Sequence, residues 1–147
     1  MKTSLYETDF YQWTIEQSQL LALGKLDDLD LVNLGEEIES LGKQQKQELR
    51  NRLGLLIGHL LKWQYQPEKR GKSWRSTIRE QRREVKKIIK ENPSLNSYLD
   101  EAIIDGYELA LDLAVRETPF DYRDLPKKCP YLIEQIFDNN FPTNMEV

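Results

Sequence analysis

The chain has 147 residues, 39% of them hydrophobic and 31% charged, with a formal net charge of −4 at pH 7. This length fits one domain, and the composition is typical of a soluble protein rich in helix. One cysteine excludes an internal disulfide and a cysteine-based metal cluster, and no apolar run approaches the roughly 20 residues that span a bilayer. The N-terminus lacks a secretory-signal pattern. We therefore expect a single helical-bundle domain over residues 1–147, located in the cytoplasm and not in a membrane.

The first two predicted helices are separated by Gly24, which is suited to ending a helix. The first covers residues 9–23, with Asp9 as its cap. The second covers residues 28–66 and carries apolar residues at helical spacing. These are Leu31, Leu34, Ile38 and Leu41, followed by Leu49, Leu53, Leu56, Ile57 and Leu60. Gly42 can bend or interrupt this segment, so the pattern leaves open whether it forms one helix or two.

Two long helices and a short one follow. The third helix begins at Ser73 and runs to about Glu91, where the sequence "NPS" interrupts the helical pattern. The fourth covers residues 95–116, and a short final helix begins near Pro130. No segment shows the alternation of a strand. The sequence therefore predicts an all-α fold, a helical bundle of four main helices plus a short C-terminal helix.

The only histidine, His59, lies at the edge of the apolar face of the second predicted helix. One interpretation is a core histidine that makes a single hydrogen bond. The other is a metal ligand or proton carrier in a polar site with the nearby Lys62. The sequence does not decide between a core residue and a functional one.

A metal site at His59 needs carboxylate partners, and the nearest upstream cluster is "EEIE". This cluster supplies Glu36, Glu37 and Glu39, which can meet His59 only if the chain reverses near Gly42. Its Glu-x-x-Glu spacing is similar to half of the magnesium site in all-α nucleotide pyrophosphohydrolases. The matching half on a later helix is missing. A metal-dependent hydrolase that uses Mg, Mn or Zn, pyrophosphohydrolase-like or nuclease-like, is thus the alternative interpretation. The sequence assigns no cofactor and no metal site.

The charge is concentrated in one segment. Residues 62–90 contain 11 Lys and Arg against three acidic residues, whereas the rest of the chain contains 10 basic and 22 acidic residues. On a helical wheel of the third predicted helix, apolar residues share one face and basic residues share a flank of that helix. The basic residues that form this candidate contact surface are Arg75, Arg79, Arg82, Arg83 and Lys86.

This basic flank has several interpretations. It can bind an acidic protein, a phosphorylated ligand or nucleic acid, but nucleic acid is a weaker candidate because the acidic remainder of the chain repels a phosphate backbone. It can also be a solvated face, or pair with an acidic flank of the fourth predicted helix within one subunit or between two. That acidic flank consists of Glu101, Asp105, Glu108 and Asp112.

Six segments together resemble one bacterial family. They are "YETDFYQW" at 6–13, "LGEEIESLG" at 34–42, "HLLKWQYQP" at 59–67, "SW" at 73–74, "NPSL" at 92–95 and "CPY" at 129–131. In this order they resemble the domain of unknown function 29 family over nearly the whole chain. The resemblance implies a small bacterial helical protein and supplies no mechanism. We therefore predict a non-enzymatic interaction protein that binds an unknown protein partner or self-associates through charged helix faces.

Overall fold

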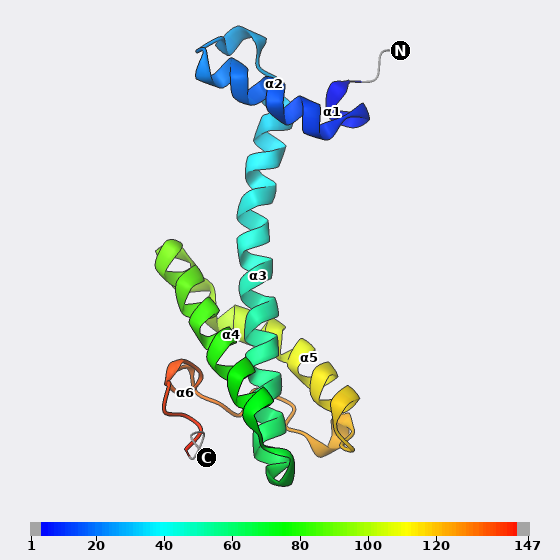
Figure 1. Ribbon diagram of the computed structural model, residues 1–147, viewed down its shortest axis with the longest axis vertical. Coiled ribbons are helices and arrows are strands. Elements are labelled where there is room, and N and C mark those ends of the chain that lie inside the picture. Colours follow the sequence, from blue (N-terminus) through cyan, green and yellow to red (C-terminus); the bar gives the residue numbers. More distant parts are fainter. Residues whose placement is uncertain (1–3, 144–147) are drawn as a thin grey trace. The chain divides into compact units, whose positions relative to one another are not determined.

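The computed structural model describes residues 4–143, and its long elements are all helices (Figure 1). The four long helices are α2 (Phe10–Ala22), α3 (Leu31–Tyr65), α4 (Lys72–Glu91) and α5 (Leu99–Glu117). Two short helices, α1 (Leu5–Thr8) and α6 (Ile133–Phe137), and four 3₁₀ turns, η1 (Leu26–Asp28), η2 (Pro67–Lys69), η3 (Pro93–Tyr98) and η4 (Tyr122–Asp124), complete the set. Residues 4–143 contain no strand. The predicted all-α class is confirmed.

Local signals explain where the helices begin and end. Asp9 caps α2, because its side chain accepts a hydrogen bond from the Gln12 amide at 3.1 Å. Gly24 has a φ of 72°, a left-handed conformation that favours glycine and follows the end of α2. α3 continues through Gly42 as a single helix, which answers the question left open by the sequence. α5 begins later than predicted because the residues after Asn92 first form the η3 turn.

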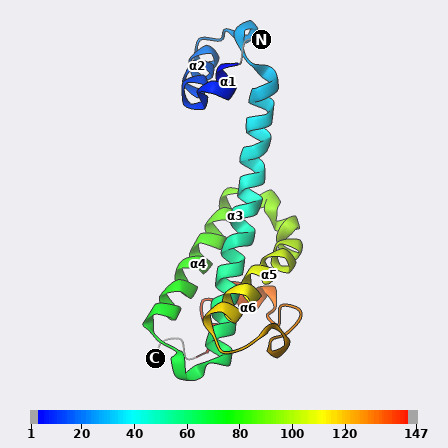
Figure 2. The ribbon, with the colours of Figure 1, turned by 90° about the vertical axis from the view of Figure 1, so that its right-hand side faces the viewer.

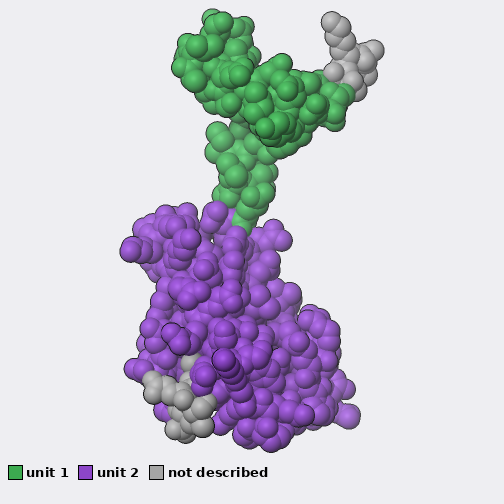
Figure 3. All heavy atoms as spheres, viewed as in Figure 1, with its two compact units in different colours: residues 1–44 green, residues 45–147 purple. Residues whose placement is uncertain are grey.

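The chain divides into two compact units, residues 1–44 and residues 45–147 (Figure 3). The single domain expected from the length stays a prediction. In the first unit Trp13 is 4% exposed and packs against the rings of Tyr6 and Phe10, at centroid distances of 4.8 and 5.6 Å. The Trp13 Nε1 donates to Asp30 Oδ2 at 3.0 Å. This aromatic cluster joins α1 and α2 to the start of α3.

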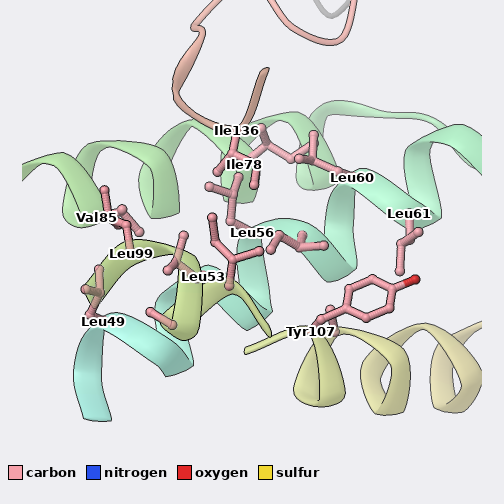
Figure 4. Close-up of a cluster of buried hydrophobic side chains, with 14 of the residues drawn as sticks. Leu49, Leu53, Leu56, Leu60, Leu61, Ile78, Val85, Leu99, Tyr107 and Ile136 are labelled. Atoms are coloured by element: carbon pink, nitrogen blue, oxygen red, sulfur yellow. The ribbon is translucent and has the colours of Figure 1, made fainter. Parts of the chain in front are cut away.

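The second unit has an aliphatic core on the C-terminal part of α3. α4 and α5 flank this part of the helix (Figure 2), and side chains from α3, α4, α5 and α6 converge (Figure 4). The apolar group predicted for this stretch is buried, with Leu53, Leu56 and Ile57 at 0% exposure. Such close packing of aliphatic side chains is the main stabilising contribution in a domain of this kind.

Glycines allow α3 and α5 to approach closely. A Cβ added to Gly54 would lie 2.8 Å from the Leu109 Cβ, and one added to Gly106 would lie 2.8 Å from the Arg50 carbonyl oxygen. A Cβ added to Gly58 would lie 2.6 Å from a methyl carbon of Leu113. These distances leave no room for a side chain, so the glycines set the spacing of the two helices.

Most of the apolar residues with helical spacing in the N-terminal part of α3 are exposed. Leu31 is 69% exposed, Ile38 67% and Leu41 60%. Helical spacing shows that one face is apolar, but it does not show whether another element covers that face. In the first unit the described residues leave most of it uncovered.

Candidate functional site

One flank of α4 and the turn after α6 enclose a pocket of about 660 Å³, which we call the basic pocket. Its lining consists of Arg75, Arg79, Arg82, Arg83, Lys86, Asn139 and Asn140. The cationic residues recur at intervals of three and four, which places them on one side of a helix. The five basic residues predicted as a contact surface therefore line one pocket, and no acidic side chain joins them.

Arg82 is buried, with only 1% of its surface exposed, so the interpretation of the basic flank as a solvated face does not hold for this residue. Its Nε donates to the Ile136 carbonyl at 2.7 Å and its Nη2 donates to the Gln135 carbonyl at 3.3 Å. Within residues 4–143 its Nη1 has no hydrogen-bond partner. Burial lowers the pKa of Arg82 and the negative charge of Asp138 opposes that shift, but a guanidinium stays protonated at neutral pH.

The other cations differ in how firmly the protein holds them. Lys86 donates from Nζ to Asn139 Oδ1 at 3.0 Å, which joins α4 to the turn after α6. Arg79 and Arg83 are exposed, whereas Arg75 is half-buried. The basic pocket thus combines a fixed arginine with exposed arginines. Arginine forks match the two oxygens of a carboxylate or phosphate, so the arrangement is suited to holding an anionic group.

The acidic flank of α5 does not neutralise this pocket. The salt bridges formed between residues of the described range are Lys43–Glu39, Arg52–Glu48 and Lys62–Glu117. None of these pairs connects the acidic flank of α5 with α4. One member of that flank, Asp112, instead accepts a hydrogen bond from the Tyr122 hydroxyl at 2.7 Å. Pairing of the two flanks within one subunit is therefore not observed among these residues.

His59 makes its hydrogen bond within its own helix. Its Nδ1 lies 2.9 Å from the Leu55 carbonyl oxygen, an arrangement in which the ring nitrogen donates. Burial lowers the pKa of His59, and the nearby Lys62 lowers it further, while the Leu55 carbonyl and Glu117 raise it. A neutral imidazole at neutral pH follows. This environment favours the interpretation of a core histidine.

Lys62 is 5% exposed, and the contacts of its ammonium group are with Glu117 and Trp74. The sequence had suggested a polar site with His59. The Lys62 Nζ lies 3.2 Å from Glu117 Oε2 and 4.7 Å from the centroid of the Trp74 ring. The ammonium therefore links α3, α4 and α5 through an ion pair and a cation–π contact. These contacts fit a role in packing.

The three candidate glutamates belong to the first unit, whereas His59 and Lys62 belong to the second. Glu37 accepts a hydrogen bond from the Tyr6 hydroxyl, and this bond is the largest cause that raises the pKa of Tyr6 to about 12. Glu39 pairs with Lys43 at 3.2 Å, and Glu36 is exposed. The reversal at Gly42 that a joint site required is absent, because α3 is continuous there. Residues 4–143 contain no cluster of three or more His, Cys, Asp and Glu side chains arranged to hold a metal ion.

Reasoning from the sequence missed the C-terminal side of the basic pocket. Asn139 and Asn140 follow α6 and line the pocket together with α4, more than fifty residues earlier in the chain. The adjacent asparagines are a turn signal, but a turn signal does not indicate which helix it will meet. The carbonyl groups of Gln135 and Ile136 carry no signal in a side-chain pattern.

Comparison with known proteins gives one match. The model of the family "Domain of unknown function DUF29" matches residues 5–142. No curated protein and no solved structure matches the chain. In the described part of the chain, every helix is too short or too polar to cross a membrane.

Proposed function

The chain belongs to the DUF29 family, and we propose that it is a binding protein whose basic pocket receives an acidic segment of a partner protein. The observation that carries this proposal is the lining of the pocket, in which five cationic side chains and two amides gather without an acidic residue. An extended anionic segment supplies carboxylates to the exposed Arg79 and Arg83.

The energetics of the pocket support an anionic ligand. Arg79 and Arg83 stand one helical turn apart, and like charges at this spacing destabilise a helix by about 0.2–0.5 kcal/mol. The buried Arg82 adds a third positive charge, and its Nη1 has no hydrogen-bond partner among residues 4–143. A buried donor without a partner costs roughly 1–3 kcal/mol. A bound carboxylate relieves the repulsion.

A protein segment fits better than nucleic acid. Outside residues 62–90 the chain has 22 acidic and 10 basic residues, and this excess of negative charge repels a long phosphate backbone. The basic pocket is a local concavity of about 660 Å³, a size suited to a few side chains. The enzymatic alternative has no comparable support, because the hydrogen bond of His59 goes to the Leu55 carbonyl.

Binding of a fluorescein-labelled oligoglutamate peptide, followed by fluorescence anisotropy at low salt, tests the proposal. We expect saturable binding that weakens at least about tenfold in the double variant Arg79→Glu, Arg83→Glu. Both residues are exposed, so the folded structure should persist, and thermal unfolding checks this.

The matched control is the double variant Lys87→Glu, Lys90→Glu. Both lysines are exposed on α4 and neither lines the basic pocket, while the change in net charge is the same. We expect this control to retain most of the affinity. Equal losses in the two variants, or an absence of binding by the unaltered protein, would contradict the proposal. Tighter binding of single-stranded DNA of matched charge would reassign the pocket to nucleic acid.

A further inference from the structure

The second unit contains another pocket, of about 380 Å³, formed by the end of α3, the turn after it and the segment around α6. We call it the aromatic pocket, after the three aromatic side chains that line it together with one arginine and two glutamines: Trp63, Tyr131, Phe141, Arg70, Gln64 and Gln135. Pockets that bind small molecules measure roughly 300–1,000 Å³ and are mostly apolar, with a few polar groups. None of the described residues lines both this pocket and the basic pocket, so it is a separate candidate site.

The apolar wall of the aromatic pocket is formed by rings from two distant parts of the chain. Trp63 is 3% exposed and belongs to the core of the second unit, so its ring is held firmly. Tyr131 and Phe141 are half-buried and pack edge to face, with ring centroids 5.7 Å apart and an interplanar angle of 65°. Aromatic rings prefer neighbours in edge-to-face or offset-stacked arrangements. This wall is therefore suited to a ligand with an aromatic body.

Arg70 supplies the charge of the aromatic pocket. Its Nε donates to the Trp63 carbonyl oxygen at 2.6 Å, and its guanidinium carbon lies 5.2 Å from the centroid of the Trp63 ring. These contacts hold the guanidinium beside the aromatic wall. Within residues 4–143 its two Nη atoms bond to no acceptor, and Arg70 belongs to no salt bridge. The end of the guanidinium is thus a fork of N–H donors, which matches the two oxygens of a carboxylate.

The two glutamines of the aromatic pocket present donors as well. Gln64 Oε1 accepts a hydrogen bond from the Tyr131 hydroxyl at 2.7 Å, and Gln135 Oε1 accepts one from the Leu132 amide at 2.9 Å. Each side-chain amide therefore has its oxygen engaged and its Nε2 left to donate. Among the described residues no acidic side chain lines this pocket. A ligand that accepts hydrogen bonds and carries one negative charge complements such a lining.

We propose that the aromatic pocket binds a small aromatic monocarboxylate. The carboxylate accepts hydrogen bonds from the fork of Arg70, and the ring packs against Tyr131 and Phe141. One arginine matches a single negative charge, whereas a phosphoryl group carries nearly two charges at pH 7 and is better matched by several cations. The site stands or fails separately from the proposed function, because different residues form it.

Phenylacetate is the probe, and nuclear magnetic resonance of the isotope-labelled full chain measures its binding. We expect saturable shifts of the Trp63 indole N–H signal and of the Gln64 side-chain amide signal. For a ligand of this size the dissociation constant should be on the order of 0.1–1 mM. The indole signal of Trp13, which belongs to the first unit, should not move. Trp63→Phe identifies the Trp63 signal by its disappearance.

Two related probes test the class of ligand. Phenylacetamide has the same ring without the charge, and cyclohexylacetate has the same charge without an aromatic ring. We expect phenylacetamide to bind at least about tenfold more weakly, and cyclohexylacetate at least about threefold more weakly. Equal binding of phenylacetamide would contradict a carboxylate site. Equal binding of cyclohexylacetate would contradict an aromatic body.

Substitution of the arginine tests the site itself. Arg70→Gln removes the charge at an exposed residue and should weaken phenylacetate binding at least about tenfold. The matched control is Lys69→Gln, which removes a charge at the neighbouring exposed residue outside the pocket lining and should keep the affinity. Arg70→Lys keeps the charge without the fork, and it should bind at least about threefold more weakly than the unaltered protein. Thermal unfolding checks that each variant is folded.

The double variant Arg79→Glu, Arg83→Glu separates this site from the basic pocket. Both arginines line the basic pocket, so this variant should bind phenylacetate as the unaltered protein does. Loss of binding in this variant, with unchanged binding in Arg70→Gln, would place the carboxylate in the basic pocket and overturn the proposal. An absence of saturable binding up to about 10 mM phenylacetate would overturn it as well.

Discussion

The two units of the chain are stabilised by different kinds of interaction. In residues 4–44 the buried residues are Trp13 and Gln17, and both bond to Asp30, through the Trp13 Nε1 and the Gln17 Oε1. In the second unit, residues such as Leu53 and Leu56 are completely buried among aliphatic neighbours. The same helix contributes to both units. The difference teaches that an amphipathic helix is stabilised by the residues that cover it. In the first unit the hydrogen bonds to Asp30 take the place of an aliphatic core.

The largest effect is expected from removing the aromatic side chain at the centre of the first unit. Trp13→Ala removes the ring that packs against both Tyr6 and Phe10, together with the hydrogen-bond donor to Asp30. Truncation of a buried tryptophan costs about 3–5 kcal/mol in the free energy of unfolding. With so few buried residues beside it, α2 should lose its protection from hydrogen exchange. Residues 49–61 of the second unit should keep theirs, as measured by mass spectrometry.

Tyr11→Ala is the control for this comparison, since Tyr11 lies on the same helix and is 74% exposed. It should leave the exchange of α2 almost unchanged. Continued protection of α2 in the Trp13 variant would show that the first unit does not depend on the Asp30 network.

An intermediate effect is expected where α3 and α5 touch. Gly106→Ala places a methyl group 2.8 Å from the Arg50 carbonyl oxygen and 3.3 Å from the Gly54 nitrogen. Both are backbone atoms, so the helices must separate, and we expect a loss of about 1–3 kcal/mol in the free energy of unfolding. Urea titration measures it. Gly35→Ala, which meets nothing within 4 Å, should instead favour the helix by about 0.5–1 kcal/mol. A lower free energy of unfolding in both variants would contradict the difference between a glycine in close helix contact and an uncovered one.

The smallest effect concerns the pH dependence contributed by His59. Burial lowers its pKa in the folded protein below the ordinary value of 6.5, so the unfolded chain binds a proton first as the pH falls. The contribution to stability is complete above 6.5 and is lost as the pH falls toward the lower pKa of the folded state. His59→Gln removes this pH-dependent contribution to the free energy of unfolding, because glutamine does not titrate.

Between pH 7.5 and 5.5 the unaltered protein should lose more stability than His59→Gln, by about 1 kcal/mol or less. Urea titrations at both pH values measure the difference, and the carboxylates contribute equally to both proteins. Parallel pH profiles would show that His59 keeps its ordinary pKa in the folded state.

Most of the helical architecture could be predicted from the sequence, because its signals are local. Asp9 and Gly24 bound α2 as expected, and Pro93 lies just beyond the end of α4. The spacing of the apolar residues also identified the buried face in the C-terminal part of α3, including Leu53 and Leu56. These features depend on the conformation of neighbouring residues, which the order of amino acids determines directly.

The remainder depends on contacts between distant segments. Arg82 lies on the basic side of α4, yet it is buried because the carbonyl groups of Gln135 and Ile136 bond to its guanidinium. Ile38 has core-like spacing but no cover within the described residues. Glu37 was grouped with a distant histidine, whereas its partner is the hydroxyl of Tyr6. In each case the helical wheel gave the right face and could not give the neighbour.

The one thiol of the chain has a practical consequence. Cys129 is half-buried, its sulfur lies 3.7 Å from the Tyr131 carbonyl oxygen, and burial raises its pKa. Because the thiolate is the reactive form, maleimides and other alkylating reagents should modify this residue slowly at neutral pH. A cysteine introduced on an exposed helix face can therefore carry a fluorophore or spin label selectively, with the native side chain left in place.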